Sequence, residues 1–140
     1  EKLIPFKDKA ILVSLDDKGR QYNEGGKIEC KYMTCSIKNF GRYTIAIDTV
    51  APKCKPQNFV SGKAFKAKEK KIIVKISDNL AGITSYNAYL NGQWILAEYD
   101  GKSGRLIMDA KKLKQGTNKL TIKLSDSKSN SASFDYTITK

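Results

Sequence analysis

The sequence predicts an all-β protein, an immunoglobulin-like β-sandwich of about seven strands that follows a smaller β-sheet segment. Residues 73–90 and 121–138 share one pattern, in which an alternating strand runs into Ser-Asp, a polar turn and a second alternating strand. Alternation of apolar and polar residues is typical of strands with one buried face. Frequent turns along residues 51–140 place these short strands at the spacing of a sandwich.

Residues 1–50 predict the smaller β-sheet segment. Strands are expected at 9–15, 27–30, 33–38 and 42–48, and Asp, Gly and Asn residues separate them. They are too few to form a complete sandwich. We therefore expect this segment to be the end of a larger β domain or to pack on its neighbour in the chain.

A domain boundary is predicted near residue 51, because Pro52 and Pro56 lack the N–H group that a strand ladder needs. The second domain would then comprise residues 51–140. Strands are expected around Phe65 and at 71–77, 83–90, 93–99, 105–108, 119–125 and 131–139, with a single helical turn at 109–114. The Asn91-Gly92 pair predicts a two-residue type I′ hairpin.

The charge of the chain is unevenly distributed. The net charge is +12, and residues 51–140 hold seventeen Lys or Arg against seven Asp or Glu. Most of these cations are dispersed Lys, whereas nucleic-acid binding usually relies on Arg forks and clustered aromatics, so no nucleic-acid partner is expected. Peptidoglycan or another anionic envelope component is a candidate partner. No apolar run is long enough to span a membrane, so no transmembrane segment is expected.

The residue types available for catalysis are few. Histidine is absent, which removes the commonest general base and the commonest zinc ligand. The expectation is that the chain has no catalytic residue, no metal site and no cofactor. The cysteines Cys30, Cys35 and Cys54 lack a C-x-x-C spacing. Cys35 is expected to be a buried thiol, and a Cys30–Cys54 or Cys30–Cys35 disulfide stays open.

The hairpin at residues 83–99 contains the candidate ligand-binding residues. Its register sets Tyr89 opposite Trp94, Asn87 opposite Leu96 and Ser85 opposite Glu98. The other face is more continuously apolar and is assigned to the core, with Leu90, Ala88, Ile95, Tyr86, Ala97 and Tyr99. Trp94, Tyr89, Asn87 and Glu98 would then form an outward aromatic and polar platform on which a sugar ring can stack.

Two other interpretations of Trp94 stay open, and burial of one kind or the other is preferred. The indole can pack against another domain, or it can lie in the core with the face assignment inverted. The carboxylates Asp78, Asp100, Asp126 and Asp135 fall mostly in turns, where Asp caps its own backbone N–H groups. Calcium binding would require several of them to converge, and the capping role is preferred.

Three motifs resemble those of a known family. They are the D-T-x-x-P junction (Asp48, Pro52), the D-N-x-x-G-I turn (Asp78, Asn79, Gly82, Ile83) and the G-x-W-x-L-x-E-Y-D strand (Gly92, Trp94, Leu96, Glu98, Tyr99, Asp100). From about Lys9 to its end, the chain resembles the C-terminal, non-catalytic region of Bacteroidetes envelope proteins with an upstream LytM/lysostaphin-type zinc metallopeptidase domain. The family's zinc motifs, H-x-x-x-D and H-x-H, have no counterpart here. The last turn also departs from the family, because Lys128-Ser129-Asn130 replaces its glycine step.

The resemblance implies an exported, non-catalytic module that spaces, orients or docks a peptidoglycan metallopeptidase in the cell envelope (periplasm or outer surface). Its partner would be the upstream peptidase domain of the same polypeptide. The alternative is a stand-alone carbohydrate- or cell-surface-binding module whose ligand lies on Tyr89 and Trp94. Retention on insoluble peptidoglycan would distinguish the two functions.

Overall fold

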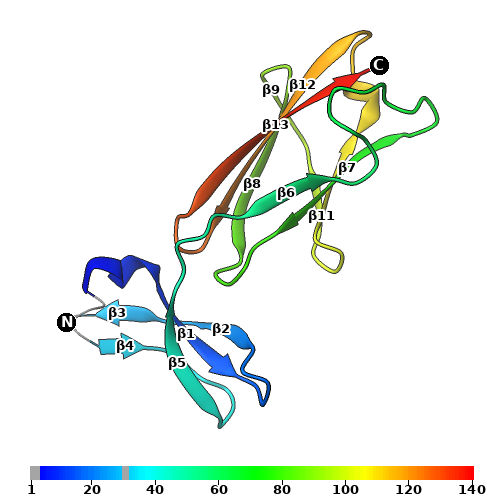
Figure 1. Ribbon diagram of the computed structural model, residues 1–140. Coiled ribbons are helices and arrows are strands. Elements are labelled where there is room, and N and C mark those ends of the chain that lie inside the picture. Colours follow the sequence, from blue (N-terminus) through cyan, green and yellow to red (C-terminus); the bar gives the residue numbers. More distant parts are fainter. Residues whose placement is uncertain (1–3, 30–31) are drawn as a thin grey trace.

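The computed structural model describes residues 4–29 and 32–140. The protein is all-β, with several antiparallel sheets and two short 3-10 helices, η1 (Ile4–Lys9) and η2 (Ala110–Lys112). Strands β1–β5 lie at one end of the molecule and β6–β13 at the other (Figure 1). We call these the N-terminal part (residues 4–47) and the C-terminal part (residues 53–140). Nowhere in the described ranges is there a helix with the length and apolar character needed to cross a membrane.

The N-terminal part holds a three-stranded sheet and a separate strand pair. The strands are β1 (Ala10–Leu15), β2 (Gln21–Gly25), β3 (Lys27–Glu29), β4 (Tyr32–Thr34) and β5 (Arg42–Ile47). The sheet order is β2-β1-β5, and β3 pairs with β4. Strand β2 was not predicted, because its polar residues carry no apolar alternation. Ile11 and Val13 of β1 are buried, and they supply most of this part's small core.

The C-terminal part holds two four-stranded sheets. Its strands are β6 (Lys53–Pro56), β7 (Lys71–Ser77), β8 (Ile83–Leu90), β9 (Gln93–Ile95), β10 (Glu98–Asp100), β11 (Arg105–Asp109), β12 (Thr117–Asp126) and β13 (Ser131–Thr139). One sheet has the order β10-β11-β7-β6 and the other the order β13-β12-β8-β9. Strand β6 was not predicted, because Pro52 precedes it and Pro56 is its last residue, but it lies at the sheet edge, where proline is tolerated.

Inward residues of both sheets form one core. Ile76 of β7 and Leu124 of β12, the matching positions of the repeated pattern, are 3% and 1% exposed and belong to the same cluster. Their neighbours Lys75 and Lys123 are exposed, as alternation along the strands requires. The predicted single turn within 109–114 is present as η2, and the Asp109 side chain accepts from the Lys111 N–H to cap it.

The predicted strand 93–99 is wrong as a single strand. It divides into β9, which pairs with β8, and β10, which pairs with β11 in the other sheet. Leu96 and Ala97 carry the chain between the sheets, and Ala97 is buried on the way. The sequence gives no sign of this crossing, because no turn residue interrupts the run. The hairpin turn itself has positive φ at both Asn91 (52°) and Gly92 (80°), as a type I′ turn requires.

A loop covers one end of the outer edge of β13. The predicted strand around Phe65 is absent, and Ala64 forms only an isolated bridge with Thr139. The Phe65 N–H donates to the Thr139 carbonyl at 2.7 Å, and the Gly62 N–H donates to the Thr137 carbonyl at 2.9 Å. These bonds satisfy edge groups that would otherwise face solvent.

Two of the three cysteines, Cys35 and Cys54, lie in the described residues. Cys35 is half-buried rather than fully buried, and its thiol donates to the Glu24 carbonyl at 3.0 Å. Cys54 is buried in the C-terminal core, and both thiols are free. Cys30 lies outside the described residues, and so does its predicted hairpin position.

Candidate functional site

Three carboxylates converge where the two parts of the chain meet. Asp48 directly follows β5, Asp78 directly follows β7, and Asp126 is the last residue of β12. One oxygen from each lies within 4.8 Å of the others. Figure 1 shows why this happens, because the turns after β7 and β12 lie at the end of the C-terminal part that faces the N-terminal part. We call these three residues the junction carboxylates.

Asp48 connects the N-terminal part to the turn after β7. Its backbone N–H donates at 2.9 Å to the carbonyl of Lys9, the residue directly before β1. Its Oδ1 accepts from the Val50 N–H at 3.0 Å, and its Oδ2 accepts from the Ala81 N–H at 2.7 Å. The residue is 0% exposed, so its charge is removed from water.

Asp126 organises the turn between β12 and β13. Its Oδ1 accepts from the Lys128 and Asn130 N–H groups, both at 2.8 Å. Its Oδ2 accepts from the Asn130 side-chain amide at 2.7 Å, and that amide also donates to the Asp48 carbonyl at 3.0 Å. Asn130 therefore links two of the junction carboxylates.

Asp78 differs from the other two in having one oxygen without a partner. Its Oδ2 accepts from the Leu80 N–H at 3.2 Å and the Gly82 N–H at 2.8 Å. Its Oδ1 is shielded from solvent and has no hydrogen-bond partner. A half-open cavity of about 130 Å³ reaches this residue from outside and is lined by Val50, Ala51, Lys53, Ser77, Asp78 and Asn79.

The junction carboxylates have no compensating ion pair among the residues that the structure describes. Lys9 approaches the site, but its Nζ donates to the Lys128 carbonyl and to Asn130 Oδ1, both at 2.6 Å. At an effective dielectric constant of about 20, two unit charges 4.8 Å apart repel by roughly 3 kcal/mol. Backbone N–H donors reduce this cost, but they do not supply a positive charge.

Apolar contacts accompany these polar ones. Ile11 and Val13 of β1 form a buried cluster with Ala81 of the turn after β7, and Leu80 packs against it. The Asn23 side-chain amide also donates to the Ala81 carbonyl at 2.9 Å. The turn at residues 78–82 therefore contacts the N-terminal part through both its backbone and its side chains.

The predicted ligand platform is only partly assembled. Tyr89 lies opposite Trp94 as predicted. Trp94 is 59% exposed, which rules out its burial in the core of this chain, and its Nε1 donates to Asn87 Oδ1 at 3.3 Å. Glu98 is not part of this surface, because β10 pairs in the other sheet and Ser85 does not face it.

Two residues assigned to the core are in fact exposed. Tyr86 and Tyr99 are 37% and 46% exposed, and their rings pack on each other with centroids 5.5 Å apart. The remaining members of the predicted core face, Leu90, Ala88, Ile95 and Ala97, are buried or pack against the core. The sheet crossing at residues 96–97 explains the error for Tyr99, because it moves that residue to the other sheet, whereas Tyr86 lies on β8 before the crossing.

Polar groups extend the outward aromatic pair across the sheet. In the register, Trp94, Tyr89, Thr121 and Asp135 form one row over β9, β8, β12 and β13. The Lys123 ammonium lies 5.3 Å from the centre of the Tyr89 ring. Lys119, 2.8 Å from Asp135, and then the Thr121 hydroxyl lower the pKa of the Asp135 carboxyl.

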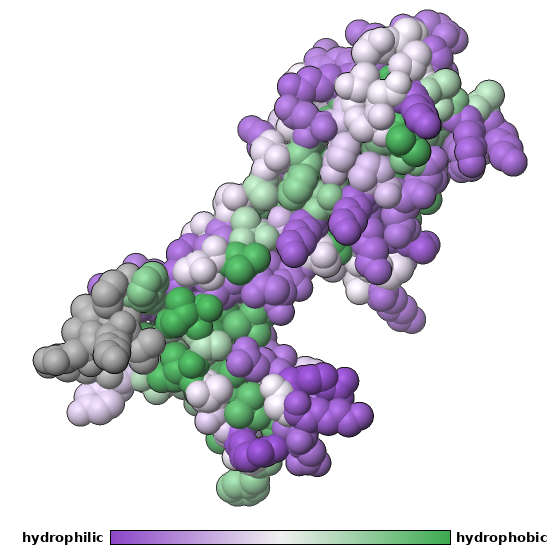
Figure 2. Space-filling model, in the orientation of Figure 1, coloured by the Kyte–Doolittle hydropathy of each residue, from purple (hydrophilic) through white to green (hydrophobic). Residues whose placement is uncertain are grey.

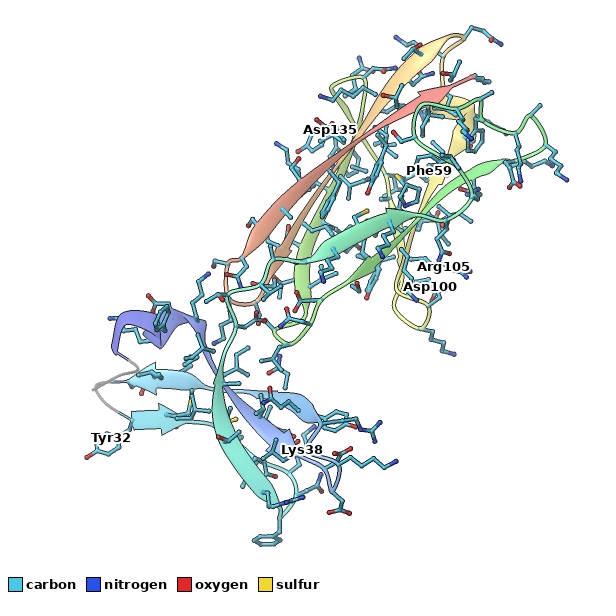
Figure 3. All side chains as sticks on the ribbon, viewed as in Figure 1. Tyr32, Lys38, Phe59, Asp100, Arg105 and Asp135 are labelled. Atoms are coloured by element: carbon cyan, nitrogen blue, oxygen red, sulfur yellow. The ribbon has the colours of Figure 1, made fainter. Side chains whose placement is uncertain are left out.

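The other sheet carries a row of cations on its outer face. Lys55, Lys75 and Arg105 lie directly opposite one another on β6, β7 and β11. Asp100 ends the row, and the Ser103 hydroxyl is the main group that lowers the pKa of its carboxyl. Figure 3 shows Asp100 and Arg105 together beside the β10–β11 turn, and Asp135 away from them on β13. Of the four carboxylates considered from sequence, only Asp78 and Asp126 converge.

Comparison with known proteins informs the N-terminal part alone. Residues 2–48 match the model of the Zu5-like domain family. No curated protein matches the chain. The matched segment ends at Asp48, the first of the junction carboxylates, and the other two lie in the part of the chain that has no match.

Proposed function

We propose that the chain is a non-catalytic accessory module that spaces, orients or docks a peptidoglycan metallopeptidase in the cell envelope, to which it would be exported. The observation that carries this proposal is the bonded junction between the two parts. A spacer must hold a direction, and a junction with buried apolar and polar contacts resists bending better than an open linker does. The proposal of a peptidase as the partner comes from the family resemblance of the motifs at Asp48 and Asp78 and of the strand through Trp94.

We infer that residues 51–140 form an immunoglobulin-like β-sandwich. Two antiparallel sheets whose inward residues share one core support this inference. The part has eight strands, β6–β13, where about seven were predicted. In this count the unpredicted β6 offsets the absent strand around Phe65, and the additional strand results from the division of residues 93–100 between the two sheets.

The N-terminal part offers a face for docking an upstream domain. Seven of the twelve large apolar side chains that are exposed in the described residues belong to residues 6–50, Phe40 and Tyr32 being the most exposed. In Figure 2 the largest hydrophobic area of the visible face lies over the N-terminal part, while hydrophilic residues cover much of the C-terminal part. Gathered apolar residues of this kind are typical of an interface.

The chain itself is proposed to be non-enzymatic, and the peptidase to lie upstream in the same polypeptide. The absence of histidine from the sequence supports this, because the family's peptidase holds its zinc with His and Asp. The test is the reading frame before residue 1. We expect it to encode H-x-x-x-D and H-x-H motifs, and an upstream frame without any peptidase motif contradicts the proposal.

The alternative is a stand-alone module that binds carbohydrate or the cell surface, and the exposure of Trp94 favours it. The indole, the Tyr89 ring and the Asn87 amide together offer two flat faces and a hydrogen-bonding group. The cationic row through Lys75 would add attraction to an anionic glycan. Retention of the isolated chain on insoluble peptidoglycan supports this alternative. If the chain is not retained and the upstream reading frame encodes a peptidase, the spacer function is supported.

A further inference from the structure

We propose that Asp48, Asp78 and Asp126 bind one calcium ion, which joins the N-terminal part to the C-terminal part. This inference goes beyond the proposed function and stands whether or not the chain serves a peptidase. It replaces the expectation from sequence that the chain holds no metal. The argument rests on the geometry of the three carboxylates, on an oxygen that lacks a partner, and on the access route to it.

The spacing of the carboxylate oxygens fits a single ion. Ca²⁺ binds oxygens at about 2.3–2.6 Å, so two of its ligands are at most about 5 Å apart. One oxygen from each junction carboxylate lies within 4.8 Å of the other two. Three oxygens at that separation are each about 2.8 Å from their common centre, so side-chain shifts of a few tenths of an ångström bring all three to one ion.

The partnerless oxygen of Asp78 is an independent sign of a ligand. Nearly all buried polar atoms of proteins have a partner, and an exception calls for a water or an ion. Asp78 Oδ1 is shielded from solvent and has none, whereas Asp78 Oδ2 and both oxygens of Asp48 and Asp126 accept N–H groups. These N–H donors fix the orientation of the three carboxylates. Asp78 Oδ1 accepts none of them and remains available to a metal ion.

The chemistry of the site favours calcium over other cations. All the candidate ligands are carboxylates, so the site is hard and lacks the nitrogen or sulfur donors that zinc and copper prefer. Asp48 and Asp126 are 0% and 3% exposed, which leaves little room for the several waters that Mg²⁺ normally keeps. The cavity lined by Asp78 gives access from solvent on the side of that residue, while Asp48 and Asp126 do not line it.

The ion would act on the junction because its ligands come from both sides of it. Asp48 is held to the N-terminal part through the Lys9 carbonyl, while Asp78 and Asp126 end strands of the C-terminal part. Without the ion, three like charges oppose the closed junction. With it, the same charges hold the junction together.

The test uses the whole chain, freed of metal with EDTA and titrated with CaCl₂ or MgCl₂. We expect equilibrium dialysis with metal analysis to find one Ca²⁺ per chain. We also expect the melting temperature to rise by about 5–10 °C at a hundredfold excess of Ca²⁺ over its Kd, with a smaller rise in Mg²⁺. A wild-type chain that binds no Ca²⁺ in dialysis overturns the proposal, and so does a bound ion that leaves the melting temperature unchanged.

The decisive variant is Asp78→Asn, and its matched control is Asp100→Asn, which changes a carboxylate that does not converge with the other three. Asp78→Asn should lose at least tenfold in Ca²⁺ affinity and most of the calcium-dependent shift. In EDTA it should melt no lower than the wild type, because one repulsive charge is gone. Asp100→Asn should keep the full calcium shift. Calcium binding that is unchanged in Asp78→Asn, or lost equally in both variants, contradicts the assignment.

Discussion

Lys75 and Arg105 lie directly opposite each other on β7 and β11, and Lys55 faces Lys75 from β6. Like charges placed directly across a ladder destabilise a sheet. Lys75→Gln should therefore leave the free energy of unfolding unchanged or raise it by up to about 0.5 kcal/mol at low salt, and added salt should erase the gain. Urea unfolding at low and high NaCl measures both effects, and a clear loss of stability at low salt contradicts this account.

The adjacent residue on β7 should respond in the opposite way. Ile76 is 3% exposed and Leu124 is 1% exposed in the same core. Truncation of either to Ala should lower the free energy of unfolding by about 2–5 kcal/mol, because each leaves a cavity. Urea unfolding of both variants beside Lys75→Gln measures the contrast. A larger loss for the Lys75 variant would mean that the faces of β7 are inverted.

Trp94 tests the outward platform. Since the indole is 59% exposed, Trp94→Ala should change the free energy of unfolding by no more than about 1 kcal/mol. If the platform binds glycan, the same change should abolish retention on peptidoglycan. Leu96→Ala is the control, because Leu96 is also exposed but lies outside the row formed by Trp94 and Tyr89. Retention that survives in Trp94→Ala excludes the indole as a ligand residue.

Ser129 occupies a backbone conformation that suits glycine. Its φ is +60°, a conformation that costs a residue with a Cβ about 1–2 kcal/mol. The family that the chain resembles has a glycine in this turn. Ser129→Gly should raise the free energy of unfolding by up to about 1 kcal/mol after the added entropy of the unfolded chain is counted. Ser129→Val should lower it by at least about 1 kcal/mol. Thermal unfolding of the two variants measures the difference. Equal melting temperatures for Ser129→Gly and Ser129→Val would contradict strain at this position.

The thiol of Cys54 should be unreactive in the folded chain. Burial raises its pKa, so the reactive thiolate is scarcer at a given pH than for an ordinary cysteine. Alkylation with iodoacetamide at pH 8, followed by mass spectrometry, should leave Cys54 unmodified in the native chain and modify it fully in guanidinium chloride. Rapid native labelling of Cys54 would show that β6 opens readily.

Local patterns predicted much of the fold. Alternation located β7, β8, β12 and β13 to within a few residues, and the Asn91-Gly92 pair located the hairpin, since both signals depend only on neighbours in sequence. The sheet crossing at residues 96–97 was missed, because an apolar chain that changes sheets looks like a continuous strand.

The junction carboxylates were harder to predict. Each of them shows in sequence only the signature of a turn, and their convergence depends on how β5, β7 and β12 are placed in space. Asp48 appears in sequence as part of the D-T-x-x-P motif, which carries no signature of a metal ligand. A Ser-Asp pair at the end of both repeated strands, together with an Asp at the linker, was the available signal.

The loop at residues 61–65, bonded along β13, also affects how the molecule behaves at high concentration. An unpaired strand edge is a template on which a second molecule can add its own strand. Here the Gly62 and Phe65 N–H groups already occupy the carbonyls of Thr137 and Thr139, so the last residues of β13 cannot recruit a neighbour. The loop thus blocks strand addition at this end of β13, and any edge-to-edge pairing of copies there would first have to displace it.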